Sequence, residues 1–193
     1  MNQEHLRLCS SAEWASTVEH EILPWALHGH TLGADVLEIG PGPGLTTAVL
    51  ARLVPKLSAV EVDPELAAAL AERMVGSNVE VVHGDGAALP FESGRFSAAT
   101  CFTMLHHVPS AELQDRLLAE VRRVLRPGGL FVGVDSLPSP DWWALHTGDV
   151  CVPVDPTGMQ ARLMEAGFGE AEVELSQPAP PRRFRFVAIR PRA

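Results

Sequence analysis

Residues 36–47, VLEIGPGPGLTT, decide the fold, because an apolar run that ends near Glu38 gives way to a sharp turn and a helical pattern. The turn holds three glycines at alternate positions: Gly40, Gly42 and Gly44. Such glycines let the backbone turn sharply and approach a ligand at the helix N-terminus, where free N–H groups favour an anion. A dinucleotide-binding turn would follow G-x-G-x-x-G, but Leu45 occupies its third glycine position. The pattern E-x-G-x-G-x-G therefore predicts a different ligand-binding strand–turn–helix unit.

Around this unit, short apolar runs alternate with amphipathic stretches, which predicts βα units on a mostly parallel sheet. We expect strands at residues 35–39, 57–62, 79–83, 97–102, 130–134, 170–175 and 184–189. The last two would form a closing hairpin, joined by the proline-rich residues 177–181. The predicted fold class is α/β, a Rossmann-like, doubly wound, seven-stranded and mostly parallel sheet whose last strand is antiparallel.

A helix should precede the first strand. Ser10 and Glu13 form a capping pair, and apolar residues follow at helical spacing: Trp14, Val18 and Ile22. We expect Pro24 and Gly29 to break this helix.

The length of 193 residues suits one domain. We expect an N-terminal helical segment (residues 1–30), a ligand-binding core (35–136), an insertion without clear periodicity (137–156), and a C-terminal helix and hairpin (157–193).

Composition places the chain among ordinary globular proteins, with 46% hydrophobic and 20% charged residues. The longest stretch without a charged residue is 16 residues, 96–111, whereas a bilayer crossing needs about 20 mostly apolar residues. The N-terminus shows no secretory signal pattern. Three scattered cysteines argue against a disulfide framework, so we expect a cytoplasmic protein with no membrane association.

Charge disfavours nucleic acid as a partner. Five arginines lie in the last twelve residues, and the first 181 residues hold 24 acidic against ten basic residues, a net charge of −14. Such a body repels phosphate backbones, so RNA binding would depend on the arginine-rich C-terminal segment.

The glycine turn and the sequence after it resemble the class I S-adenosylmethionine (SAM)-dependent methyltransferases over residues 35–136. Glu61, in AVEVDPEL, stands 21 residues after Gly40, and Asp85 lies in HGDGAALPF. The stretches FSAATCFTMLHHVP and RVLRPGGLFVGVD resemble the type 11 subgroup, which includes many small-molecule methyltransferases. The resemblance implies SAM as cosubstrate and a small-molecule methyl acceptor.

The resemblance also implies roles for single residues. Glu61 would accept hydrogen bonds from both ribose hydroxyls, as a partly exposed acid with no protein partner. Asp85 would accept from the adenine amino group, with the backbone at Gly86 facing the ring. Glu38 would orient the methionine ammonium, usually through water, and Thr103 would lie beside the cofactor.

Each site residue also has a purely structural interpretation. The glycines could form only a tight turn, Glu61 could be a solvated strand-end acid, and Asp85-Gly86 is a common turn dipeptide. His106 and His107 are the candidate catalytic bases, although histidines after a strand are as often packed structurally. A second group could roof a substrate site or pin a loop by aromatic burial: Trp142, Trp143, His146 and Asp149. We expect no metal site at His146 and Asp149, because the sequence places no third ligand beside them.

Three alternatives to a small-molecule methyltransferase remain. An rRNA adenine dimethylase has similar opening motifs, but it would carry an Asn/Asp-Pro-aromatic motif where this chain has Cys101-Phe102-Thr103-Met104. A nicotinamide oxidoreductase fits poorly because of Leu45, and the chain has no tyrosine for the short-chain type. The domain could also bind SAM without catalysis. No residue selects one methyl acceptor or one oligomeric state.

Overall fold

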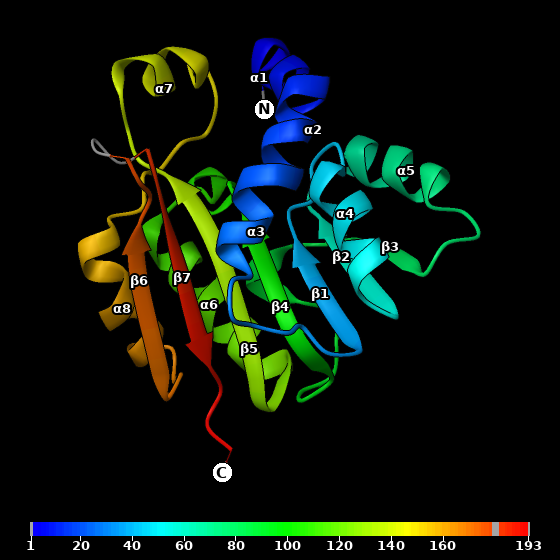
Figure 1. Cartoon of the computed structure of the whole chain (residues 1–193), viewed down its shortest axis with the longest axis vertical. Coiled ribbons are helices and arrows are strands. Elements are labelled where there is room, and N and C mark those ends of the chain that lie inside the picture. The colour runs from blue at the N-terminus through cyan, green and yellow to red at the C-terminus, as the bar shows by residue number, and fades with distance from the viewer. Residues whose placement is uncertain (1, 179–181, 193) are drawn as a thin grey trace.

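The computed structural model of the chain describes residues 2–178 and 182–192 and contains a seven-stranded sheet in the order β3-β2-β1-β4-β5-β7-β6 (Figure 1). The strands are β1 (Asp35–Ile39), β2 (Lys56–Glu61), β3 (Val79–His83), β4 (Phe96–Phe102), β5 (Leu125–Ser136), β6 (Glu170–Leu175) and β7 (Arg183–Ile189). β7 pairs antiparallel with β5 and β6, and the remaining pairs are parallel. The predicted fold class is confirmed, and every strand except the longer β5 lies within one residue of its predicted position.

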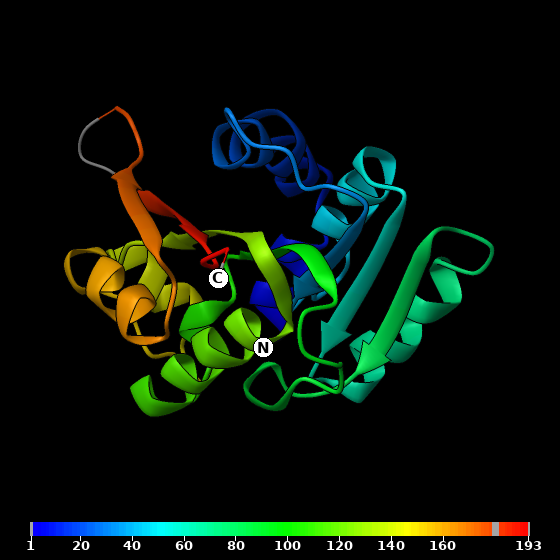
Figure 2. The same cartoon turned by 90° about the horizontal axis from the view of Figure 1, so that it is seen from below.

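Helices cover both faces of the sheet (Figure 2). They are α1 (Gln3–Cys9), α2 (Ala12–Thr17), the π-helical turn η1 (Val18–Ile22), α3 (Leu23–Ala26), α4 (Leu45–Leu53), α5 (Pro64–Arg73), the 3₁₀ turns η2 (Gly86–Ala88) and η3 (Leu105–His107), α6 (Ala111–Val124), α7 (Pro140–Leu145) and α8 (Pro156–Glu165). One apolar layer joins η1, α3 and α4 to the sheet, and the other joins α6 and α8 to it. None of the helices described here is long and apolar enough to cross a membrane.

The N-terminal helix differs from its prediction at both ends. Ser11, rather than Ser10, is the cap, since its hydroxyl accepts from the Trp14 backbone N–H at 3.1 Å. The helix also continues past Pro24 to Ala26. A proline lacks the N–H for an intrahelical bond, and here it directly follows a π-helical turn in which the Leu23 N–H donates to the Val18 carbonyl.

The insertion at residues 137–156 contains a short helix that the sequence analysis did not predict. Ser139 caps α7 by accepting from the Trp142 N–H at 3.1 Å, and Pro140 occupies its first turn. Both α1 and α7 lie beyond the carboxyl ends of the parallel strands (Figure 1). These two segments therefore flank the end of the sheet where α/β folds bind ligands.

Much of the arginine-rich C-terminal segment is built into the sheet and is not a free tail. Its centre is strand β7, and Arg185 donates to the Glu174 carboxylate and to the Trp25 carbonyl, both at 2.7 Å. Arg190 donates to the main-chain carbonyls of Arg122 and Arg123 at 3.1 and 2.9 Å. These guanidinium groups hold elements together. Residues 179–181 of the predicted proline-rich connection lie outside the described residues.

Candidate active site

A pocket of about 380 Å³ opens at the carboxyl ends of β1, β2 and β4. Seven of the predicted site residues line it: Gly40, Gly42, Glu61, Asp85, Gly86, Thr103 and His107. Glu38, Gly44 and His106 are not among the residues that line it. Trp14 and Val18 of the N-terminal helix and Val150 of the insertion also line it. The strand ends and the two flanking segments thus enclose one cavity.

The glycine turn takes a backbone conformation that favours glycine. Gly40, Gly42 and Gly44 have φ angles of +64°, +53° and +83°, in the left-handed region where L side chains are strained. A Cβ at Gly40 would also lie 2.8 Å from the Met104 side chain. The conformation and the close packing together explain why glycine is needed at this turn.

Glu61 ties the second strand to the glycine turn. Its carboxylate accepts from the Gly42 N–H at 2.9 Å and from the Asp63 N–H at 3.0 Å, and the residue is only 5% exposed. The expectation of a partly exposed acid without a protein partner is therefore wrong. A carboxylate has about four lone-pair positions, so two protein donors leave it able to accept from a ligand as well.

Glu38 is buried behind the turn with half of its carboxylate unpaired. The Thr46 hydroxyl donates to Oε1, whereas Oε2 is buried without a hydrogen-bond partner. Burial raises the pKa of Glu38 to about 7, against the opposing effect of the hydroxyl. A buried carboxylate with a spare oxygen is poised to accept from a cation or from a water molecule that a cation orders.

Asp85 caps a turn, as in the structural interpretation of the Asp85-Gly86 dipeptide. Its carboxylate caps η2 by accepting from the Ala87 N–H at 2.8 Å, while the exposed side chain remains at the pocket edge. At Gly86, a Cβ would lie 2.9 Å from Leu117 and 3.0 Å from Ile39. Glycine at this position therefore also serves the packing of η2 onto α6 and β1.

Thr103 carries backbone strain at the end of β4. Its φ of +50° is the single positive value among non-glycine residues in the described chain. A β-branched residue in this region is an outlier, and such outliers concentrate at functional sites. The Thr103 N–H donates to the Val134 carbonyl at 2.7 Å, which holds the residue at the pocket wall.

The two candidate bases occupy different places. His107 lines the pocket, with its Nδ1 3.0 Å from the Val150 carbonyl and its Nε2 buried without a partner. Burial lowers the pKa of His107 to about 4, so its ring is neutral at pH 7. His106 is 2% exposed, and both its Nδ1 and its backbone N–H contact the Asp135 carboxylate, at 2.5 and 3.1 Å. Of these two histidines, only His107 lines the pocket and can contact a ligand there.

Sequence reasoning missed two contributors to this region. His5 of α1 lines the pocket, and Asp135, fully buried at the end of β5, anchors His106. The VD pair at the end of the β5 pattern could have indicated Asp135. No local signal indicates His5, because it lies about 30 residues before the first motif.

Comparison with known proteins shows the family. Residues 37–133 match the model of the type 11 methyltransferase domain, which is half of the chain. The chain belongs to this methyltransferase family. The match covers the glycine turn and the strand ends that form the pocket, and the predicted resemblance is confirmed.

Curated relatives and solved structures agree with this assignment. The ubiquinone biosynthesis O-methyltransferase of Xanthomonas oryzae pv. oryzae is 36% identical over 100 residues, which are 50% of this chain and 41% of the relative. The chain thus spans less than half the length of the curated relatives that it matches there. A phosphoethanolamine N-methyltransferase 2 of Haemonchus contortus, solved with S-adenosyl-L-methionine, superposes with a TM-score of 0.75 at 14% identity, over 99% of this chain and 60% of the other.

A second structural neighbour matches over its full length. A chain of the complex between the Haloferax volcanii Trm112 methyltransferase activator and a methyltransferase has a TM-score of 0.74 at 14% identity, and 99% of both chains is covered. At this identity the likeness concerns the fold. It accounts for all seven strands, including the antiparallel β7.

Proposed function

We propose that the chain is a SAM-dependent methyltransferase that acts on a small-molecule acceptor. The observation that carries the proposal is the convergence of the E-x-G-x-G-x-G turn, the Glu61 carboxylate and the pocket edge at Asp85 on one cavity in a chain of this family. We also propose that residues 1–193 form one domain, in which residues 137–156 form part of the acceptor side.

The residues of the cavity fit the cosubstrate. The orphaned Oε2 of Glu38 would receive the methionine ammonium through water, and the remaining lone pairs of Glu61 would accept from the ribose hydroxyls. Asp85 would accept from the adenine amino group. When bound, SAM supplies a methyl group already activated by its sulfonium. The protein would therefore contribute mainly by positioning the two reactants and excluding water.

The acceptor side is largely apolar, with Trp14, Val18 and Val150 on its wall. Such a wall favours a small acceptor with an apolar body. An oxygen or carbon acceptor also needs a base, and His107 is the better of the two candidates because it lines the cavity. His106, bonded to Asp135 behind it, would be a positioning residue.

The test is incubation with methyl-labelled SAM and a fractionated cell extract, followed by mass spectrometry of the labelled products. We expect a small labelled molecule. Labelled RNA would favour the dimethylase alternative, and SAM binding without any labelled product would favour a non-catalytic SAM-binding domain.

A further inference from the structure

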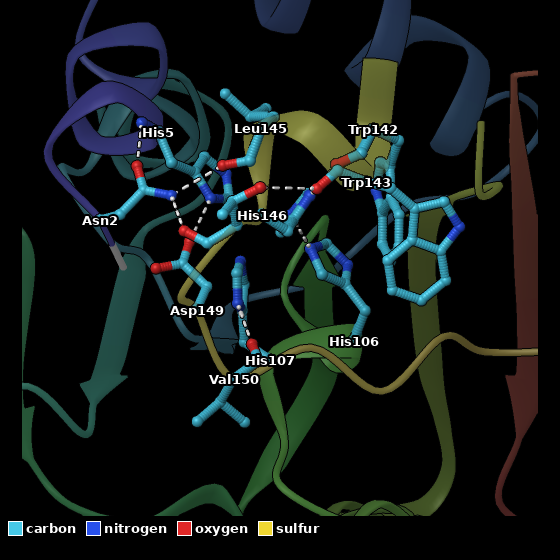
Figure 3. Close-up of polar contacts among 11 residues, drawn as sticks. Asn2, His5, His106, His107, Trp142, Trp143, Leu145, His146, Asp149 and Val150 are labelled. Carbon is cyan, nitrogen blue, oxygen red and sulfur yellow. Dashed lines mark hydrogen bonds and ion pairs between the residues drawn. The ribbon is translucent and has the colours of Figure 1, made fainter. Parts of the chain in front are cut away.

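Four histidines gather where α1, η3 and α7 meet, at the edge of the pocket (Figure 3). They are His5 of α1, His106 and His107 of η3, and His146, which directly follows α7. Their ring centroids lie between 4.3 and 5.3 Å from those of their neighbours in the group. We call this group the histidine cluster. It brings together three segments that are distant in sequence.

Each ring of the histidine cluster has its Nδ1 against an oxygen. His107 and His146 face the main-chain carbonyls of Val150 and Trp142 at 3.0 and 2.6 Å. Since a carbonyl only accepts, these two Nδ1 atoms carry the proton and the neutral rings present a bare Nε2.

The other two rings face carboxylates. His5 Nδ1 lies 3.1 Å from Asp149, and His106 Nδ1 lies 2.5 Å from Asp135. An ionised carboxylate also only accepts, so these rings too carry the proton on Nδ1. Bonds from the outer nitrogen of an imidazole to a carboxylate or carbonyl are the usual supports of histidines that bind a metal through the other nitrogen.

The Nε2 atoms of three rings in the cluster lack a hydrogen-bond donor. The Nε2 of His107 is buried with no hydrogen-bond partner, and the Nε2 atoms of His106 and His146 face one another at 3.2 Å. Two neutral rings in these tautomers oppose lone pair to lone pair. A proton on His106 would serve the contact with His146, but it would leave His107 unpaired. A cation bound by His107 and His146 would use the lone pairs of both of their Nε2 atoms.

We propose that His5, His107 and His146 bind a divalent transition-metal ion, with Zn²⁺ as the best fit. One ligand nitrogen of each lies within 4.8 Å of the others. A tetrahedral ion with Zn–N bonds of about 2.0–2.1 Å holds its nitrogens about 3.4 Å apart, so the rings need to draw together by up to about 1.4 Å. Imidazole ligands suit Zn²⁺, Cu²⁺ or Ni²⁺ rather than Mg²⁺ or Ca²⁺, which prefer oxygen.

Three protein ligands leave the fourth position of a tetrahedral ion open. His5 and His107 both line the main pocket, so this position faces the acceptor side. Open sites with three protein ligands are typical of catalytic rather than structural zinc. The fourth ligand would be water or an oxygen of the acceptor, and His107 would then be a ligand instead of a base. Metal binding itself does not depend on the proposed function.

The first test is metal binding by protein without a histidine tag. After chelator treatment, calorimetry with Zn²⁺ should show one equivalent bound and an increased melting temperature. His107→Asn and His146→Asn should each reduce affinity by more than roughly 100-fold, since even outer-shell changes cost about 10- to 100-fold. His20→Asn, which removes an exposed histidine of η1, is the matched control and should leave the affinity unchanged.

The second test needs no variant. Co²⁺ added to the metal-free wild-type protein should give the intense visible absorption of a four- or five-coordinate nitrogen site, and Zn²⁺ should abolish it. Three results would overturn the proposal: weak octahedral absorption with Co²⁺, no binding of Zn²⁺ by the wild-type protein, or Zn²⁺ affinities of the two cluster variants that equal the wild-type affinity. All these readouts are independent of methyl transfer, so a failed methylation assay does not affect them.

Discussion

The two ends of the pocket differ in how the chain assembles them. At the cofactor end, the glycine turn, Glu61 and Asp85 each lie at or just beyond the carboxyl end of a strand, in the order of the sequence. At the histidine end, His5, His107 and His146 come from a helix before the sheet, a 3₁₀ turn and the end of α7. The first end can be predicted from spacing, because parallel strands bring their carboxyl ends together. The second exists only after the N-terminal helices and the insertion have packed over the sheet.

The largest expected effect is a loss of methyl transfer without a loss of SAM affinity when the histidine end is changed. His107→Gln should reduce methyl transfer by roughly 100- to 10,000-fold, the range for a positioned acid–base group, because it removes the bare nitrogen at the acceptor side, whether that nitrogen acts as a base or as a metal ligand. SAM affinity should change little, and His106→Gln should have the smaller effect. Single-turnover rates and calorimetry measure both quantities. A rate loss under about tenfold for His107→Gln would indicate that this ring serves only packing.

At the cofactor end, the pH dependence of the stability tests the state of the Glu38 carboxylate. Its pKa is raised to about 7 in the folded protein, so the folded state holds the proton more tightly than the unfolded state. Its contribution to stability is present at low pH and is lost as the pH rises from about 4.5 to about 7, a change of about 3 kcal/mol. Urea unfolding at several pH values should show this decline, and Glu38→Gln should remove it. A ligand ammonium favours the carboxylate, so SAM affinity should rise over the same range.

Truncation of the Glu61 side chain tests a second residue at the cofactor end. Glu61→Ala leaves the buried Gly42 N–H without an acceptor and also removes the part-buried bond from the Asp63 N–H, which should cost about 1–3 kcal/mol of stability. SAM affinity should fall at least roughly tenfold as the ribose contacts are lost. Glu61→Gln keeps one oxygen acceptor and is the matched control, with an intermediate effect on both. Thermal melts without ligand and calorimetry with SAM measure them separately, and unchanged affinity in Glu61→Ala would exclude the ribose role.

Asp85 should show the smallest effect. Asp85→Ala removes one cap from a three-residue turn and one exposed ligand contact, so stability and SAM affinity should each change by about 1 kcal/mol. Asp85→Asn keeps the cap through its amide oxygen and separates the two contributions. A drop in stability without any change in affinity would make Asp85 a turn residue alone.

Sequence periodicity predicted the sheet well because most strands are short apolar or alternating runs bounded by turns. It failed where backbone hydrogen bonding compensates for a breaker, as at the π-helical turn before Pro24. It also treated Glu61 as an isolated acid, because a carboxylate that accepts from backbone N–H groups has the same sequence signature as a solvated one. His5 and His146 stand 141 positions apart, and only the packed N-terminal helix and insertion bring them together.

The most direct test of the proposed cofactor site is a calorimetric titration of the wild-type protein with SAM, with its demethylated product and with NAD. We expect one molecule of SAM or of the demethylated product to bind per chain, a higher melting temperature with each, and no heat with NAD. Binding of NAD without binding of SAM would contradict the proposed cofactor site.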